Sequence, residues 1–320
     1  MVQIERLSKE TLPGLVDCER ASVDKWFLYH SLTEKEETTY DELSPFQCWL
    51  HGGPTMDLSI ATNYWQESKQ EIFDPNDIFV ACEDSTIAGF IGAFYGEDAA
   101  IPGKHAYIDL LLIRPKKRRL GIASKLLEKV EQTARRNGCD SLLVYPEELT
   151  RPSGQFYLRN GFSIWKRRFM LRLPTITEPS FEPYLQPAPL ERNATWQLII
   201  GWHSTSLKAW FLLHSSFEEE FFKAKRLVYT LQAEGLSPAL LGGICWHPVF
   251  QFGAVYLWFS GEKQELSLKH ISALQFLGHL VGLKQINLVF LEELLPCIQN
   301  FSLNDQPREL EPFLIKKIMR

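Results

Sequence analysis

The chain has 320 residues, more than a single domain usually contains, so the sequence predicts two domains. Hydrophobic residues make up 45% and charged residues 23%, which is ordinary for a globular protein with a buried core. The net charge of −5 argues against a general nucleic-acid binder. The cysteines form no C-x-x-C pair and no Cys/His cluster at zinc spacing, so we expect reduced thiols and no metal site. Without a secretory pattern or a run of about 18 apolar residues, we expect a cytoplasmic protein that does not enter a membrane.

The first elements in chain order are a strand and a helix followed by an aromatic segment. We expect the strand at residues 2–7 and the helix at residues 12–26. Residues 27–66 are then rich in aromatic and carboxylate side chains. His51 and the aromatic residues of this segment either line a substrate site or simply pack as a helical cover, and the sequence leaves both open.

A hairpin is expected next, with strands at residues 78–83 and 87–95 and a turn at Asp84 and Ser85. Residues 107–113 then form an apolar run with the length of a buried strand, in which Asp109 is the only charged residue. A cationic loop follows, because five of the six residues 114–119 are Lys or Arg.

A helix should begin around Gly121, because the apolar residues that follow recur at helical spacing and end before Asn137 and Gly138. Another strand is expected at residues 141–144. The N-terminus of such a helix presents unpaired N–H groups and the positive end of its dipole. A small residue and nearby cations let a phosphate come close, so the unit predicts a diphosphate site. A plain crossover with a solvated basic loop is the structural alternative.

At these residues the sequence resembles the GNAT-type N-acetyltransferase superfamily. Its R/Q-x-x-G-x-G/A signature is matched by Arg118, Gly121 and Ala123. Its A-x-x-F-Y-x-x-x-G-F segment is matched at residues 153–162, except that Ser153 replaces the usual Ala. The resemblance covers roughly residues 75–173.

The resemblance implies an α/β (α+β) fold, a mixed and mostly antiparallel GNAT sheet flanked by helices. It also implies that the strands at 87–95 and 107–113 splay apart in a V that holds the pantetheine arm of acetyl-CoA, the donor substrate. Strand residues 96–98 would end where an acceptor amine arrives. The predicted donor contacts are Leu111, Leu112, Ile113, Arg118, Arg119, Leu120, Gly121, Ile122, Ala123 and Ser124, with Lys117 near the phosphates.

For catalysis, the resemblance places Tyr157 as the general acid beside the cofactor sulfur, although packing against the sheet is its alternative role. The base is less defined. Glu97, at the expected mouth of the V with Asp98, is the first choice, and Asp109 is the second. A water chain without a dedicated base is equally compatible. A buried and ionised Asp109 would need a partner such as a cation.

The second half repeats this element order in weaker form, and an unrelated α/β domain with the same order by coincidence is the alternative. We expect a hairpin at 226–232 and 239–247, strands at 255–259, 286–291 and 313–319, and a helix at 268–283. Its loop reads SGEKQELS, with two glutamates where phosphates would need cations. We therefore predict three parts: a GNAT domain at 1–173, a proline-rich linker without strand or helix periodicity at 174–192, and a degenerate GNAT-like domain at 193–320.

The sequence thus predicts an acetyl-CoA-dependent N-acetyltransferase that acts on an amine of a small molecule or peptide. The alternative is a non-catalytic acyl-CoA-binding regulatory or interaction protein. Nucleic acid is a poor third partner, because no basic stripe accompanies the loop. The identity of the acceptor, the length of the acyl chain and the oligomeric state are left open.

Overall fold

The structure is a computed structural model that describes residues 2–31, 34–69, 76–84, 86–146, 148–179, 181–188, 195–202, 205–215, 223–247, 250–301 and 305–318. The elements of the first half are β1 (Gln3–Arg6), α1 (Leu12–Arg20), β2 (Trp26–Tyr29), β3 (Lys35–Thr38), α2 (Pro45–Gly52), α3 (Leu58–Glu67), β4 (Asn76–Glu83), β5 (Thr86–Asp98), β6 (Ile101–Ile113), α4 (Ile122–Arg136), β7 (Ser141–Val144), α5 (Pro152–Arg159) and β8 (Ser163–Pro174). Those of the second half are β9 (Tyr184–Pro187), β10 (Gln197–Ile200), α6 (Ser206–His214), β11 (Lys225–Gln232), β12 (Ala239–His247), β13 (Phe252–Phe259), α8 (Leu268–Leu280), β14 (Gln285–Leu291), α9 (Leu295–Gln299) and β15 (Arg308–Lys317).

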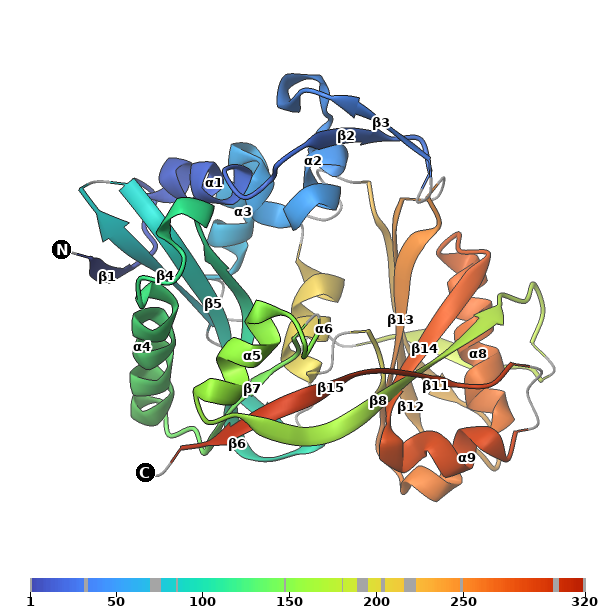
Figure 1. Ribbon diagram of the computed structural model, residues 1–320. Helices are drawn as coiled ribbons and strands as arrows, with labels where there is room; N and C mark the ends of the chain where they lie inside the picture. The colour runs from blue at the N-terminus through green and yellow to red at the C-terminus, as the bar shows by residue number, and fades with distance from the viewer. Residues whose placement is uncertain are drawn as a thin grey trace.

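The larger sheet takes strands from both halves of the chain. Its order is β1-β4-β5-β6-β7-β15-β8-β14. The last strand of the chain, β15, therefore lies between β7 and β8 of the first half (Figure 1). Leu314 of β15 is opposite Val144 of β7 on one side and Ile164 of β8 on the other. The sheet of the first half is complete only when the end of the chain returns to it.

The exchange of strands is reciprocal. The far end of β8 pairs with β14 of the second half, from Arg168 opposite Leu291 to Pro174 opposite Gln285. Within the larger sheet, β14 of the second half thus pairs with β8 of the first half. β15 of the second half pairs with both β7 and β8. The two halves are joined through hydrogen-bonded backbone as well as through side chains.

A smaller sheet belongs to the second half and has the order β10-β13-β12-β11-β9. It meets the larger sheet at β10, where the Gly201 N–H donates to the Val289 carbonyl of β14 at 2.8 Å. A separate hairpin of β2 and β3 stands above both sheets (Figure 1).

Helices cover both faces of the larger sheet. On one face α4 buries a stripe that includes Leu126 and Val130 against residues such as Leu142. On the other face α1, α3 and α6 share one apolar cluster (Figure 1). Phe211 of α6 contacts the rings of Tyr64 and Phe94, with centroids 5.3 and 5.7 Å away. This cluster therefore continues from the first half into the second.

The structure confirms a mixed α/β fold with mostly antiparallel sheets flanked by helices. It also contains the predicted hairpins and the helix that follows Gly121. The first helix ends at Arg20 instead of residue 26, because the chain turns there to enter β2. The last strand begins at Arg308 and not at 313, and Met319 and Ser85, in the predicted turn, lie outside the described residues.

The proline-rich segment 174–192 contains a strand that we did not expect. β9 pairs with β11 at the edge of the smaller sheet, with Leu185 opposite Leu231. An edge strand tolerates a proline at its end, as at Pro187, because one side of the strand needs no donors. Residues 189–192 lie outside the described residues, so the boundaries of the three predicted parts stay a prediction.

Replacing a buried side chain of β15 tests how far the first half depends on the last strand. Leu314 is fully buried between β7 and β8. We expect Leu314→Ala to lower the free energy of unfolding by about 2–5 kcal/mol, because it leaves a cavity in the sheet. Urea unfolding of the whole chain measures this change. The control is Lys317→Ala, which removes an exposed side chain from the same strand and should change it by under about 0.5 kcal/mol. Equal effects of the two variants would contradict the prediction.

Candidate active site

The loop between β6 and α4 ends in a backbone shape that suits a phosphate. Arg119 and Gly121 have left-handed φ angles of 67° and 78°. Gly121 is the N-cap of α4, and a Cβ there would meet no atom within 4 Å, so the space in front of it is open. The first helical hydrogen bond at this end joins Lys125 N to the Gly121 carbonyl at 3.2 Å. The N–H groups of residues 121–124 therefore point to an acceptor outside the helix.

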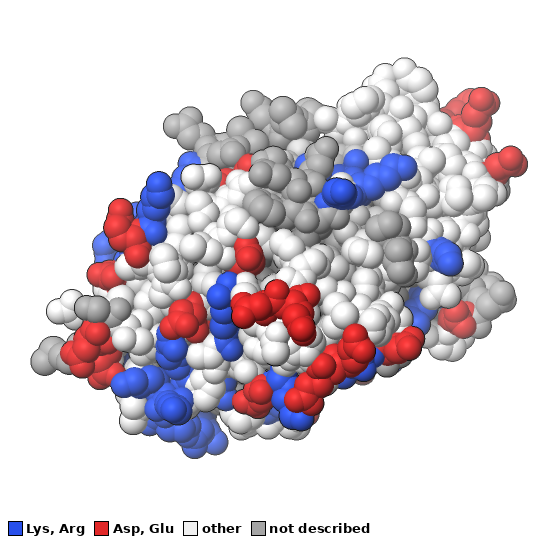
Figure 2. All heavy atoms as spheres, turned by 90° about the horizontal axis from the view of Figure 1, so that it is seen from above, with Lys and Arg blue, Asp and Glu red and all other residues white. Residues whose placement is uncertain are grey.

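Some cations of this loop bind other parts of the protein, whereas Arg119 is exposed to solvent. Lys117 forms an ion pair with Glu83, so the structure does not direct it to the open space as we predicted. Arg118 donates from Nε to the Ile113 carbonyl at 3.1 Å and so holds the shape of the loop. Arg119 is exposed and pairs with no described residue. Figure 2 shows Lys and Arg side chains gathered at the end of the molecule where β4 and the start of α4 lie.

β6 and β7 run parallel only as far as Ile108 and Val144 and then separate. Beyond this point β6 keeps β5 on one side, and no strand of the described chain pairs with its other side. Along this edge the backbone of residues 109–113 therefore pairs with no described strand, although the Ile113 carbonyl accepts the Arg118 side chain. Leu111, Leu112 and Ile113 lie on this edge and are half-buried.

The predicted V is therefore present, but its arms are not the ones we expected. β5 and β6 stay paired up to Gly89 opposite Ile113, so the hairpin does not splay. Antiparallel strands joined by a tight turn are held together along their length, whereas a parallel pair joined by a helical crossover can diverge. The V opens between β6 and β7.

A carboxylate lies where the V opens. A register shift between Gly92 and Ala93 of β5 leaves Asp109 as the extra residue of a bulge in β6. Its Oδ2 accepts a hydrogen bond from Nζ of Lys208 at 2.7 Å, and the two side chains are only 12% and 8% exposed. The Lys208 Nζ also lies 3.4 Å from the Tyr64 hydroxyl. The predicted cationic partner of Asp109 thus exists, and it comes from the second half.

Further polar side chains surround this ion pair. Tyr107 is buried, and burial together with the Asp109 charge raises the pKa of its phenol. The same phenol lies in the electrostatic field of Tyr145, which follows β7, and of Arg168 of β8. We call Tyr64, Tyr107, Asp109, Tyr145, Tyr157, Arg168 and Lys208 the seam cluster, because its members come from both halves and meet where the V opens.

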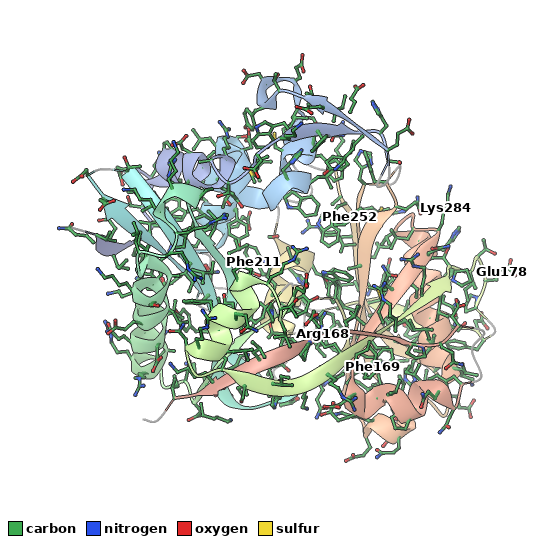
Figure 3. The ribbon with its side chains drawn as sticks, viewed as in Figure 1. Arg168, Phe169, Glu178, Phe211, Phe252 and Lys284 are labelled. Atoms are coloured by element: carbon green, nitrogen blue, oxygen red, sulfur yellow. The ribbon has the colours of Figure 1, made fainter. Side chains whose placement is uncertain are left out.

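Arg168 is the second buried cation of the seam cluster. It is 1% exposed, and its Cζ lies 3.8 Å from the centre of the Tyr145 ring. Nη2 donates to the Trp202 carbonyl at 3.1 Å, whereas Nη1 has no partner among the described residues. A cavity of about 20 Å³ beside it has room for about one water molecule. Figure 3 places Arg168 and Phe211 in the middle of the molecule, between its two parts.

Tyr157 of α5 is 5% exposed and packs edge-on against Phe156 and Phe162, with ring centroids 5.3 Å away in both cases. Burial raises the pKa of its phenol, and the nearby Tyr107 adds to this. The side chain therefore stays protonated at neutral pH, as a proton donor must. Both roles that we considered for it, packing and proton donation, suit this position.

Glu97 and Asp98 do not lie where the V opens. They end β5 at the hairpin, where Asp98 is opposite Ile101, while β6 opens only from residue 109 onward. Glu97 is exposed. Asp98 is buried and accepts the backbone N–H of Ser206 at 2.6 Å, at the start of α6. Our expectation that these carboxylates meet an acceptor amine at the mouth of the V is wrong, because the V opens partway along β6.

The aromatic segment forms a groove with the second half. A cavity of about 450 Å³ is lined by Tyr29, Trp49, Leu50, His51, Gly52, Gly53 and Phe252. Figure 3 shows Phe252 beside the gap between the two parts. His51 is 3.0 Å from the Phe27 carbonyl through its Nε2, so its ring is held by backbone. The segment thus packs and lines a groove, and its role as a substrate site stays a prediction.

Sequence reasoning missed Lys208, Tyr107 and Arg168, and it included Tyr64 only as one of the aromatic residues of segment 27–66. The sequence could have indicated that Lys208 is a buried charge, because it is the one lysine in the mostly apolar stretch SLKAWFLLH. The described residues contain no group of three or more His, Cys, Asp or Glu that could hold a metal ion. Within those same residues, no helix is both long and apolar enough to cross a membrane.

Comparison with known protein families gives a match for part of the chain. Residues 37–162 match the acetyltransferase (GNAT) family. This part of the chain is a GNAT acetyltransferase domain. The matched range contains the Gly121 loop, the open edge of β6 and Tyr157. The GNAT domain marks the protein as an enzyme and supports acyl-CoA-dependent acetyl transfer as its general activity.

Solved structures extend the likeness over the whole chain. A GCN5-related N-acetyltransferase from Anabaena variabilis is 12% identical, with a TM-score of 0.55 over 98% of this chain and 72% of that one. One from Kribbella flavida is 11% identical, with a TM-score of 0.56 over 98% and 70%. PaiA N-acetyltransferase from Thermoplasma acidophilum, in complex with coenzyme A, is 20% identical over 52% and 92%, with a TM-score of 0.37. Curated protein sequences give no match. At these identities the likeness shows the fold alone.

Two glycines at the ends of α4 allow a matched test of the GNAT loop. Gly121 and Gly138 have φ angles of 78° and 72°, and a Cβ on either meets nothing within 4 Å. We expect Gly121→Glu to weaken acetyl-CoA binding at least about tenfold in a calorimetric titration, because its carboxylate repels phosphate at the helix N-terminus. Gly138→Glu has the same backbone cost at the other end of the helix, so binding should be unchanged. Equal losses would show that strain and not the phosphate site is responsible.

Proposed function

We propose that the protein transfers the acetyl group of acetyl-CoA to an amine of a small molecule or peptide by direct attack of the amine. The strongest support for this proposal is the open edge of β6. It extends from the seam cluster to the loop that leads into the N-terminus of α4. An extended ligand that pairs with this edge has a phosphate site at one end and buried proton-transferring groups at the other. Acetyl-CoA has a diphosphate and a thioester at the two ends of an amide-containing arm.

On this proposal the diphosphate binds the N–H groups of residues 121–124, with the exposed side chain of Arg119 beside it. The arm pairs with the backbone of Leu111, Leu112 and Ile113. The thioester then lies near Asp109, at the bulge where β6 turns away from β7. Gly89 supports this path from behind, because a Cβ there would lie 2.7 Å from the Leu112 carbonyl and push β5 away from β6.

The chemistry needs no covalent intermediate on the enzyme. The amine nitrogen attacks the thioester carbon, the new C–N bond forms and the C–S bond breaks. A base accepts the proton that the amine loses, and an acid protonates the departing thiolate. We assign the acid to Tyr157, whose phenol stays protonated. Products are the acetylated amine and free CoA.

For the base, the geometry favours Asp109 over our first choice, Glu97. Asp109 lies at the bulge next to the open edge, and its second carboxylate oxygen, Oδ1, accepts no hydrogen bond from any described residue. Glu97 is exposed at the far end of β5. An ordered water can still carry the proton from the amine to Asp109.

The second half has a comparable gap between β13 and β14, but its own backbone occupies it. β10 pairs with β13, and the Gly201 N–H that follows β10 bonds to β14. The loop after β13 carries Glu262 and Glu265, which form a capping box around a 3-10 turn. These features support one donor site per chain and a degenerate GNAT-like second half.

The proposal is tested by measuring CoA release from acetyl-CoA over a panel of small amines and peptides. We expect turnover of at least one amine, with Tyr157→Phe lowering kcat about a hundredfold and leaving acetyl-CoA affinity unchanged. Tyr184→Phe, at an exposed tyrosine of the second half, is the matched control. Binding of acetyl-CoA without turnover of any amine would overturn the proposal in favour of a non-catalytic acyl-CoA-binding protein.

A further inference from the structure

Helix α6 of the second half carries one charged side chain into the interior. Its residues from Ser206 to Leu213 are all buried, and Lys208 is 6% exposed. Burying an ammonium group is costly unless a charge partner accompanies it. The apolar packing of α6 gives no reason for a lysine at this position. Its reason must lie in what Lys208 contacts.

Lys208 contacts Asp109 from one side and aromatic rings from others. Nζ is 2.7 Å from Oδ2 of Asp109 and lies 5.1 to 5.7 Å from the ring centres of Phe94, Tyr64 and Phe211. Burial alone would lower the pKa of Lys208, but the Asp109 carboxylate and the Tyr64 hydroxyl raise it above its ordinary value. Lys208 therefore stays charged throughout the neutral range.

Asp109 in turn has Lys208 as its charged neighbour. The titratable groups that face it are Lys208 from α6, Tyr64 from α3 and Tyr107 from its own strand. Arg168 and Tyr145 lie on the other side of Tyr107 and stack on each other. Lys208 is the cation in direct contact with the carboxylate.

We propose that Lys208 is a positioning residue of the catalytic centre: it holds Asp109 ionised, with Oδ1 free to take the proton of the acceptor amine. This rests on the proposed function. In the step itself the amine gives its proton to Asp109 Oδ1 as the C–N bond forms, and the thiolate takes a proton from Tyr157. Asp109 then loses its proton to water and Tyr157 regains one. Lys208 keeps its proton throughout and acts only through Asp109.

The proposal makes the second half part of the active site. Lys208 is 99 residues from Asp109 in the chain. The Asp98 carboxylate, at the end of β5, accepts the first N–H of α6 and so ties the start of that helix to the larger sheet. The helix that delivers the lysine is thus docked on the strands that form the donor site.

The test is the pH profile of kcat for the whole chain, with an amine found active in the screen. Without the adjacent cation the ionised carboxylate is disfavoured, so protons bind it at higher pH. We expect Lys208→Met to move the acid limb of the profile upward by about one pH unit or more. Because the amine is the same for both enzymes, its own titration cannot produce the difference. Lys208→Arg should restore most of the wild-type limb.

Two further variants separate this role from mere packing. In an Asp109→Asn background, Lys208→Met should cause no additional shift, because the lysine acts through the carboxylate. Lys225→Met, at an exposed lysine of the second half, should leave the profile unchanged. Acetyl-CoA titration of every variant verifies that the donor site is intact.

Each outcome decides something different. A wild type that turns over no amine removes the proposed function and this inference with it. An active wild type whose Lys208→Met variant keeps the same acid limb overturns the inference alone. A Lys208→Met variant that still binds acetyl-CoA and has a raised acid limb, while Lys208→Arg keeps the wild-type limb, supports it. Loss of acetyl-CoA binding in Lys208→Met would assign the lysine to folding and overturn the proposal.

Discussion

The pairing of β15 with β7 and β8 is the interaction on which the rest of the structure depends. Without it, β7 would have a free edge in the interior of the molecule, where unpaired backbone groups are costly. The strand that fills this place comes from the end of the chain, so everything between residues 175 and 307 must fold compactly enough to bring it back. Within that stretch α6 lies against β5, and from there its Lys208 reaches Asp109 of the seam cluster.

Along the open side of β6, the described part of the chain leaves strand backbone without a partner strand. β7 diverges after Val144, and residues 109–113 keep donors and acceptors that no described strand uses. Such an edge is stable next to water or a ligand. It begins at a bulge with a charged residue and ends at a helix N-terminus with a cationic loop. On the proposed function, the two ends of the edge have complementary roles: one binds the anion and the other takes part in proton transfer.

What the sequence could predict was set by how far apart the interacting residues are in the chain. The Gly121 loop, the α4 stripe and the hairpin of β4 and β5 depend on neighbours within about 20 residues, and local patterns were enough to find them. The arms of the V, the place of β15 and the Lys208 partner of Asp109 depend on topology. A lone aspartate in an apolar run and a lone lysine in an apolar helix each signalled a buried charge, but nothing in the sequence paired the two.

The two halves have a similar order of strands and helices, but they differ in whether the gap between two of their strands is open or filled. In the first half the gap between β6 and β7 stays open, and the loop that follows β6 is cationic. In the second half β10 occupies the gap between β13 and β14, and the corresponding loop carries glutamates. The strand in this gap satisfies backbone groups there, which is consistent with the proposal of one donor site per chain. Its remaining link to the chemistry is α6, whose single buried cation reaches the open gap of the other half and pairs with the carboxylate that lies there.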